Sequence, residues 1–157
     1  MRIYLMQHGK PVSKEEDSER PLSDEGRNDV ERMAEFLQRS GVRIEGILHS
    51  GKTRARQTAE IMVSRLNPGL EPQERPGLSP LDDVKEIADQ IKEVKQDLWI
   101  VGHLPHLARL TSLLIASTKS VPVVSFRQGG VVCLEKGEEG HWFVAWMLVP
   151  ELMKGKA

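Results

Sequence analysis

The chain has 157 residues, 39% of them hydrophobic, and its 22 lysines and arginines nearly balance 23 aspartates and glutamates for a formal charge of -1. This length suits one domain with its own core, and we expect a single domain over residues 1–157. The balanced charge excludes a global field that would attract nucleic acid or an anionic membrane, so any anion site must be local.

The lone cysteine, Cys133, lies in the apolar stretch GGVVCLEK. With no partner it excludes a disulfide within the chain, fits a reducing compartment and is best interpreted as a buried strand residue. The N-terminal apolar stretch is too short for a signal peptide, and no later stretch approaches membrane-spanning length. The prediction is a cytoplasmic protein that binds neither membrane nor nucleic acid.

Apolar patterning in the first half alternates between strand and helix. RIYLM indicates a short buried strand, and after the polar loop 11–21 Ser23 can cap a helix whose first turn is acidic and which Gly41 ends. GILHS (46–50) indicates a second strand. The spacing then predicts a helix over 53–66, stopped before Pro68, and a proline-rich loop with a brief extended piece at 70–74.

The second half continues the alternation. Apolar spacing predicts a helix over 82–95, a buried strand over 97–102 and a helix over 106–116. GGVVCLEK and HWFVAWMLV, separated by EEG, are typical of an antiparallel hairpin. The order predicts an α/β fold, a three-layer sandwich whose mainly parallel sheet has helices on both faces and an antiparallel C-terminal edge hairpin.

Polar residues follow three of the predicted strands. The first strand leads into Gln7, His8 and Gly9, the second into His49, Ser50 and Gly51 with Arg54 behind them, and the third into His103. Parallel sheets bind ligands at the carboxyl ends of their strands, beside helix N-termini. We therefore expect His8, Arg54 and His103 to meet at one edge as an anion site.

Each of these residues taken alone also has a structural interpretation. A single histidine at a strand end is more often hydrogen-bonded structure than catalyst, and Arg54 and Arg56 can form a solvated helix face. His49, His106 and His141 are best interpreted as structural. Metal binding by two histidines lacks a spacing such as HxxxH or an accompanying carboxylate, so no metal and no cofactor is predicted.

Four stretches together resemble the histidine phosphatase superfamily, the phosphoglycerate mutase-like proteins. LMQHGKP resembles its LxRHGxx opening, RPLSDEGR its RPLTxxG segment, HSGKTRARQTAEIM its SPxxRAxQTAxxL signature, and IVGHLPHLARL its later strand, histidine and proline. They occur in the family's order along nearly the whole chain. The short length and the third motif resemble the small SixA-type phosphohistidine phosphatases.

The resemblance implies a metal-independent mechanism. His8 matches the nucleophile, which as neutral imidazole attacks phosphorus and forms a phosphohistidine intermediate that water hydrolyses. Arg54 matches the arginine that grips two phosphate oxygens, and His103 the second histidine, which donates to a third when protonated. Gly9 is expected to leave room for the phosphate and for backbone N–H donors.

Gln7 departs from the family pattern, which has arginine there. Glutamine keeps an amide donor but lacks the positive charge and the planar, two-donor guanidinium of arginine. The expected loss of transition-state stabilisation is on the order of 3 kcal/mol, or roughly a hundredfold in rate. Lys10 is hypothesised to restore part of this charge, although a solvated loop lysine is the simpler interpretation. Gly51 replaces the usual proline, with an effect expected on loop stiffness alone.

The leaving group and the partner stay open at this point. Asp82 or Asp83 can act as general acid, with Asp83 the residue we select for the site, but both are also ordinary helix-start acids. The imidazole of phosphohistidine can leave without a strong acid. A chain too short for a lid domain suits a phosphorylated protein surface, which Arg20, Arg56 and Arg127 can contact, although solvated side chains are the simpler interpretation of these arginines. The alternatives are a pseudophosphatase that only binds phosphate or phosphoprotein, and a small phosphomonoesterase.

Overall fold

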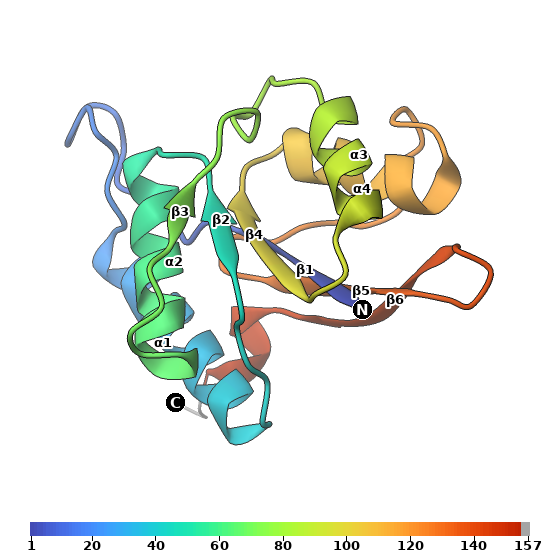
Figure 1. Cartoon of the computed structure of the whole chain (residues 1–157). Coiled ribbons are helices and arrows are strands. Elements are labelled where there is room, and N and C mark those ends of the chain that lie inside the picture. The colour runs from blue at the N-terminus through green and yellow to red at the C-terminus, as the bar shows by residue number, and fades with distance from the viewer. Residues whose placement is uncertain (155–157) are drawn as a thin grey trace.

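A computed structural model describes residues 1–154, and its elements share one six-stranded sheet in the order β3-β2-β4-β1-β5-β6. Strands β1 to β4 run parallel, while β5 pairs antiparallel with β1 and β6 with β5. Helices lie on both sides of the sheet, and the terminal hairpin forms one edge (Figure 1). The predicted fold class is confirmed.

The strands and helices follow the predicted alternation. The strands are β1 Arg2–Gln7, β2 Ile47–His49, β3 Gln73–Glu74, β4 Leu98–Gly102, β5 Val131–Lys136 and β6 Trp142–Leu148. The helices are α1 Asp24–Arg39, α2 Thr53–Leu66, α3 Lys85–Glu93, α4 His106–Ala116 and the short 3-10 helix η1 Pro150–Met153, which the patterning did not predict.

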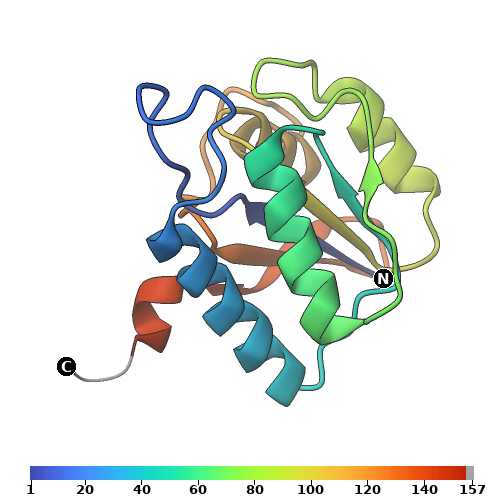
Figure 2. The same cartoon turned by 90° about the vertical axis from the view of Figure 1, so that its left-hand side faces the viewer.

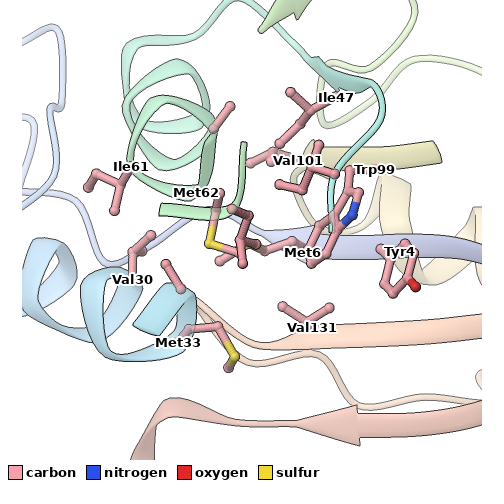
Figure 3. Close-up of a cluster of buried hydrophobic side chains, with 14 of the residues drawn as sticks. Tyr4, Met6, Val30, Met33, Ile47, Ile61, Met62, Trp99, Val101 and Val131 are labelled. Carbon is pink, nitrogen blue, oxygen red and sulfur yellow. The ribbon is translucent and has the colours of Figure 1, made fainter. Parts of the chain in front are cut away.

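Two apolar cores lie on opposite faces of the sheet because alternate residues of the buried strands point to opposite sides. On β1, Ile3 and Leu5 pack toward α3 and α4, whereas Tyr4 and Met6 pack toward α1 and α2. Figure 3 shows the second of these clusters, in which methionines of both helices meet the strands. Cys133 belongs to this cluster as a fully buried strand residue, as predicted.

Helix α1 begins where the sequence predicts because Ser23 caps it. The Ser23 hydroxyl accepts the Gly26 N–H at 3.0 Å and donates to the Lys10 carbonyl at 2.9 Å. The cap therefore satisfies a free helical donor and also ties the start of α1 to the segment that follows β1.

Helix α3 is shorter than the predicted 82–95. Asp82 and Asp83 accept backbone N–H groups of Ser79 and Lys85 at 2.9 and 3.0 Å, so they shape the turn before the helix instead of entering it. At the other end Val94 turns to extended backbone. Among residues 1–154, no helix is long and apolar enough to cross a membrane.

Figure 2 looks onto α1 and α2, which lie side by side. The loop that follows β1 and the N-terminal end of α2 lie at the same edge of the molecule in both views (Figures 1 and 2). This edge is where the carboxyl ends of the parallel strands meet.

Candidate active site

Strand register brings the predicted site residues to a common edge. Gln7 pairs with Gly102, the last residues of neighbouring β1 and β4, and the His8 N–H donates to the Gly102 carbonyl at 3.1 Å. His8 and His103 therefore leave the sheet side by side, and their ring centroids lie 5.0 Å apart. On the other side of β4, His49 at the end of β2 pairs with Val101, so Ser50 reaches the same edge.

His8 is held as one tautomer by its neighbour. Its Nδ1 lies 2.7 Å from the Gly9 carbonyl oxygen, and because a carbonyl only accepts, Nδ1 carries the proton. The lone pair of the neutral ring is then on Nε2. Burial is the main cause that lowers the pKa of His8 to about 4, with Arg54 and Arg20 adding to it, so the ring is neutral near pH 7.

His103 is also buried and neutral. Burial, then the nearby His8 and Arg54, lower its pKa to about 3. Its Nε2 lies 2.6 Å from the Ser50 hydroxyl oxygen, while its Nδ1 is buried with no partner within residues 1–154. One ring nitrogen is thus hydrogen-bonded within the protein, and the other is buried without a partner from residues 1–154.

The charged groups that act on the histidine pair are cations. Arg54, at the start of α2, is half-buried, and its pKa is lowered by burial and by Arg20. Its Nε has no partner among the described residues. Lys52 lies near His103 on the exposed rim. The structure thus brings His8, Arg54 and His103 near one another with Arg20 close by. Such a gathering of cations favours an anion.

Gly9 is required for a reason other than the expected one. A Cβ there would lie 2.8 Å from Val30 Cγ2 and 3.0 Å from the Gly26 carbonyl oxygen, both on α1. Its N–H donates to the Thr58 hydroxyl at 3.0 Å and is not free for a phosphate. The glycine lets β1 and α1 approach closely, and the room and backbone donors expected near it for a phosphate stay a prediction.

Gln7 is buried at the last position of β1, with 8% of its surface exposed. Its backbone carbonyl accepts the Gly129 N–H at 2.9 Å, which fixes the main chain. Its Oε1, however, is buried and has no partner among residues 1–154. A buried amide oxygen without a hydrogen-bond partner costs stability. The Oε1 of Gln7 therefore does not contribute to the stability of the fold.

Lys10 is engaged elsewhere. Its Nζ forms an exposed ion pair with Glu25 Oε2 at 2.9 Å, and it lines a hollow of about 270 Å³ together with Arg127 and Lys154. The ammonium charge that was hypothesised to replace the family arginine is therefore already paired. Arg56 pairs with Glu60 along the exposed face of α2, in keeping with its structural interpretation.

Asp82 and Asp83 accept hydrogen bonds in the turn before α3. Both act electrostatically on His106, the buried first residue of α4, and not on His8 or His103. The structure places Asp83 in the walls of the hollows along α3, away from the cations that surround His8. Neither carboxyl group therefore lies where it affects the pKa of the histidine pair.

Gly51 does more than alter loop stiffness. Its φ of +90° is one that a proline ring, fixed near -65°, cannot adopt. A Cβ there would also overlap the Glu74 carboxylate. The expectation of an effect on stiffness alone is wrong, since this loop has a backbone path that favours glycine.

Sequence reasoning did not select Ser50 and Thr58, which organise the site. Ser50 binds His103, and Thr58 accepts the Gly9 N–H while donating to the Arg54 carbonyl at 2.7 Å. The signal was present, since both residues lie within the HSGKTRARQTAEIM stretch. Within residues 1–154, no group of three His, Cys, Asp or Glu side chains is placed to hold a metal ion.

The sheet of this α/β protein brings two neutral imidazoles and a half-buried guanidinium to one edge, an arrangement suited to an oxyanion. Residues 3–99 match the family model described as histidine phosphatase superfamily (branch 1). This match covers more than half of the chain, which therefore belongs to that superfamily.

Relatives and solved structures agree. An uncharacterised protein of Picosynechococcus is 32% identical over 87% of this chain and 86% of its own length. The phosphohistidine phosphatase SixA of Escherichia coli K12 is 26% identical over 96% of this chain and 94% of its own. The solved protein histidine phosphatase SixA complexed with tungstate superposes with a TM-score of 0.86 at 26% identity, covering 98% of this chain and 100% of that one. The resemblance to the SixA-type branch is confirmed.

Proposed function

We propose that the protein is a metal-independent phosphatase that removes phosphate from phosphohistidine on a phosphotransfer or signalling protein. The observation that carries the proposal is the Nδ1–H to Gly9 hydrogen bond, which leaves the lone pair of His8 on Nε2 among cations. Support also comes from the likeness to SixA, which was solved with tungstate, a tetrahedral oxyanion like the phosphoryl group.

The reaction takes two displacements. The Nε2 lone pair of His8 forms a bond to phosphorus while the phosphorus–nitrogen bond of the substrate breaks. The substrate imidazole leaves neutral because its second nitrogen already carries a proton. One water then attacks phosphorus, His8 departs with its Nδ1–H retained, and both water protons remain on the dihydrogen phosphate released.

The placement of Asp82 and Asp83, the two candidate acids, favours this substrate class. A serine or threonine oxygen leaves poorly unless an acid protonates it, and Asp82 and Asp83 are occupied by backbone N–H groups near α3. An imidazole whose conjugate acid has a pKa of about 6.5 is a far better leaving group. Arg54 and Arg20 supply the charge that the phosphoryl oxygens require.

The test is the discharge of a phosphorylated histidine phosphotransfer domain, with a phosphoserine peptide assayed in parallel. We expect the wild type to release phosphate from the first and little from the second, and His8→Ala to release none. His141→Ala, which changes an exposed histidine in the β5–β6 turn, is the matched control and should retain the rate. Equal rates for wild type and His8→Ala would refute the proposal.

A second candidate is a module that binds phosphate or phosphoprotein without useful turnover. Gln7 favours this candidate, because its buried amide replaces the charged guanidinium that the family has at this position. Its Oε1 has no partner within the described part of the chain. In that case no variant discharges the domain, yet inorganic phosphate still binds to the wild type and binds more weakly to Arg54→Ala.

A further inference from the structure

The hydroxyl of Ser50 lies between two nitrogen atoms at the site. Ser50 is the first residue after β2, and its Oγ accepts the Lys52 N–H at 3.3 Å and lies 2.6 Å from His103 Nε2. A serine hydroxyl has one proton and two lone pairs. With one lone pair turned to Lys52, its proton is available for the imidazole nitrogen.

The direction of the hydrogen bond between Ser50 and His103 decides whether Nδ1 of His103 is a donor or an acceptor. If Nε2 carried the ring proton, the buried Nδ1 would be a bare lone pair, which repels the oxygens of an oxyanion. If Ser50 donates to Nε2, the ring proton lies on Nδ1, and the nitrogen that has no partner within residues 1–154 becomes a donor. Only the second arrangement lets a neutral ring assist an oxyanion.

We propose that Ser50 is a positioning residue that sets the tautomer of His103, so that the ring presents an Nδ1–H to the oxyanion bound at the site. The inference rests on the proposed function for the identity of that oxyanion as a phosphoryl group. It revises the mechanism that the family resemblance implies, in which the second histidine donates only when protonated.

A neutral donor suits the surroundings of the ring. The charged and titratable groups that face it come from three elements: His8 after β1, Lys52 and Arg54 at the start of α2, and His106 in α4. These groups and burial oppose protonation, and they lower the pKa of His103 to about 3. With Ser50 in place, His103 needs no added proton to donate, so phosphate binding is independent of its titration.

The decisive experiment is NMR of the folded chain with ¹⁵N-labelled histidine, which distinguishes the two tautomers, combined with binding of inorganic phosphate between pH 5 and 8. The variants are Ser50→Ala and Ser50→Thr, the latter restoring a hydroxyl. Ser64→Ala is the control, because its hydroxyl bonds to the Ile61 carbonyl on the exposed side of α2.

We expect His103 of the wild type to carry its ring proton on Nδ1. In the Ser50→Ala variant, His103 should carry its ring proton on Nε2. At pH 8 the variant should bind phosphate roughly tenfold more weakly, the loss of about one hydrogen bond. The ratio to wild type, in which the ligand's own protonation cancels, should stay at roughly ten from pH 8 to pH 5, because His103 with a pKa of about 3 remains neutral over that range. Ser50→Thr should recover the wild-type tautomer and affinity.

An Nε2–H tautomer in the wild type would overturn the proposal, as would an unchanged tautomer in Ser50→Ala or a phosphate affinity of Ser50→Ala equal to that of the wild type. The NMR and binding measurements need no turnover. A wild type that hydrolyses no phosphorylated substrate would therefore refute the proposed function, while the tautomer of His103 would still support or overturn the role of Ser50.

Discussion

At the scale of single residues, hydrogen bonds to uncharged groups set the chemistry of the two histidines. The Gly9 carbonyl fixes the proton of His8 on Nδ1, and the Ser50 hydroxyl binds Nε2 of His103. Both rings are neutral because burial lowers their pKa values. The charge for an oxyanion must therefore come from neighbouring cations such as Arg54, Arg20 and Lys52, which makes the charge of residue 7 important.

Replacing Gln7 by arginine should accelerate the reaction. The new guanidinium would add charge and a second donor beside the phosphoryl group, and the expected gain is roughly ten- to a hundredfold in kcat/KM for phosphohistidine. Gln7→Lys is the matched variant, which restores charge without the fork and should gain less. A rate unchanged in both variants would show that residue 7 does not contact the reacting group.

Replacing Lys10 by alanine should leave phosphate affinity unchanged within about twofold. Its ammonium is paired with Glu25 on the exposed side of α1, and exposed pairs of this kind contribute roughly 0–1 kcal/mol. Calorimetric titration with inorganic phosphate measures the effect, with Arg54→Ala as the variant expected to bind at least tenfold more weakly. A tenfold loss in Lys10→Ala would instead restore the hypothesis that Lys10 replaces the family arginine.

At the scale of elements, the site depends on how closely the chain after β1 approaches α1. Gly26 on α1 faces the backbone of Lys10, and Gly9 faces Val30 and the Gly26 carbonyl. Ser23 joins the same two segments through its hydrogen bonds to Lys10. Small residues at this contact place His8 against the sheet edge, so the packing of α1 and the position of His8 are linked.

Gly26→Ala should therefore destabilise the protein although alanine is the better helix former. Its Cβ would overlap the Lys10 carbonyl oxygen and lie 2.8 Å from the Lys10 nitrogen, and backbone cannot move aside as a side chain can. We expect a loss of about 3 kcal/mol in the free energy of unfolding, measured by urea denaturation.

Gly46→Ala is the matched control, because no atom of the described residues lies within 4 Å of a Cβ at that position. Its free energy of unfolding should change by less than about 1 kcal/mol. Equal losses in the two variants would show that the β1–α1 contact does not limit residue 26.

At the scale of the whole molecule, burying neutral histidines makes stability depend on pH. The pKa values of His8, His49, His103 and His106 are all lowered by burial as the leading cause. In the unfolded chain these rings titrate near 6.5, so below that pH the unfolded state binds more protons than the folded state. Their contribution is complete above about pH 6.5 and is lost as the pH falls through the folded values.

The free energy of unfolding should accordingly decrease as the pH is lowered from 6.5 to 4. The decrease should be less steep for the His8→Gln variant. A shift from 6.5 to about 4 corresponds to a contribution of roughly 3 kcal/mol for His8 at most. Urea denaturation at a series of pH values measures the slope, with His141→Gln as the exposed control that should follow the wild type. Parallel curves for wild type and His8→Gln would contradict the expected linkage.

Much of the architecture was predictable from the chain because local physics decides it. Apolar spacing located α2 and α4 at the bounds observed, Ser23 marked the start of α1, and unbroken apolar runs marked β1 and β4 as strands buried on both faces. The motifs around His8, Arg54 and His103 likewise selected residues that the sheet brings to one edge.

Only the tertiary structure decided how those residues are used, because the partners are far apart in sequence. Thr58 takes the Gly9 N–H, Glu25 takes the Lys10 ammonium, and Ser50 takes the His103 ring nitrogen across 53 positions. Hydrogen bonds of this kind follow from register and packing, which no local pattern of spacing contains. The sequence by itself determined which residues reach the strand ends, and the fold determined which of their atoms remain free for chemistry.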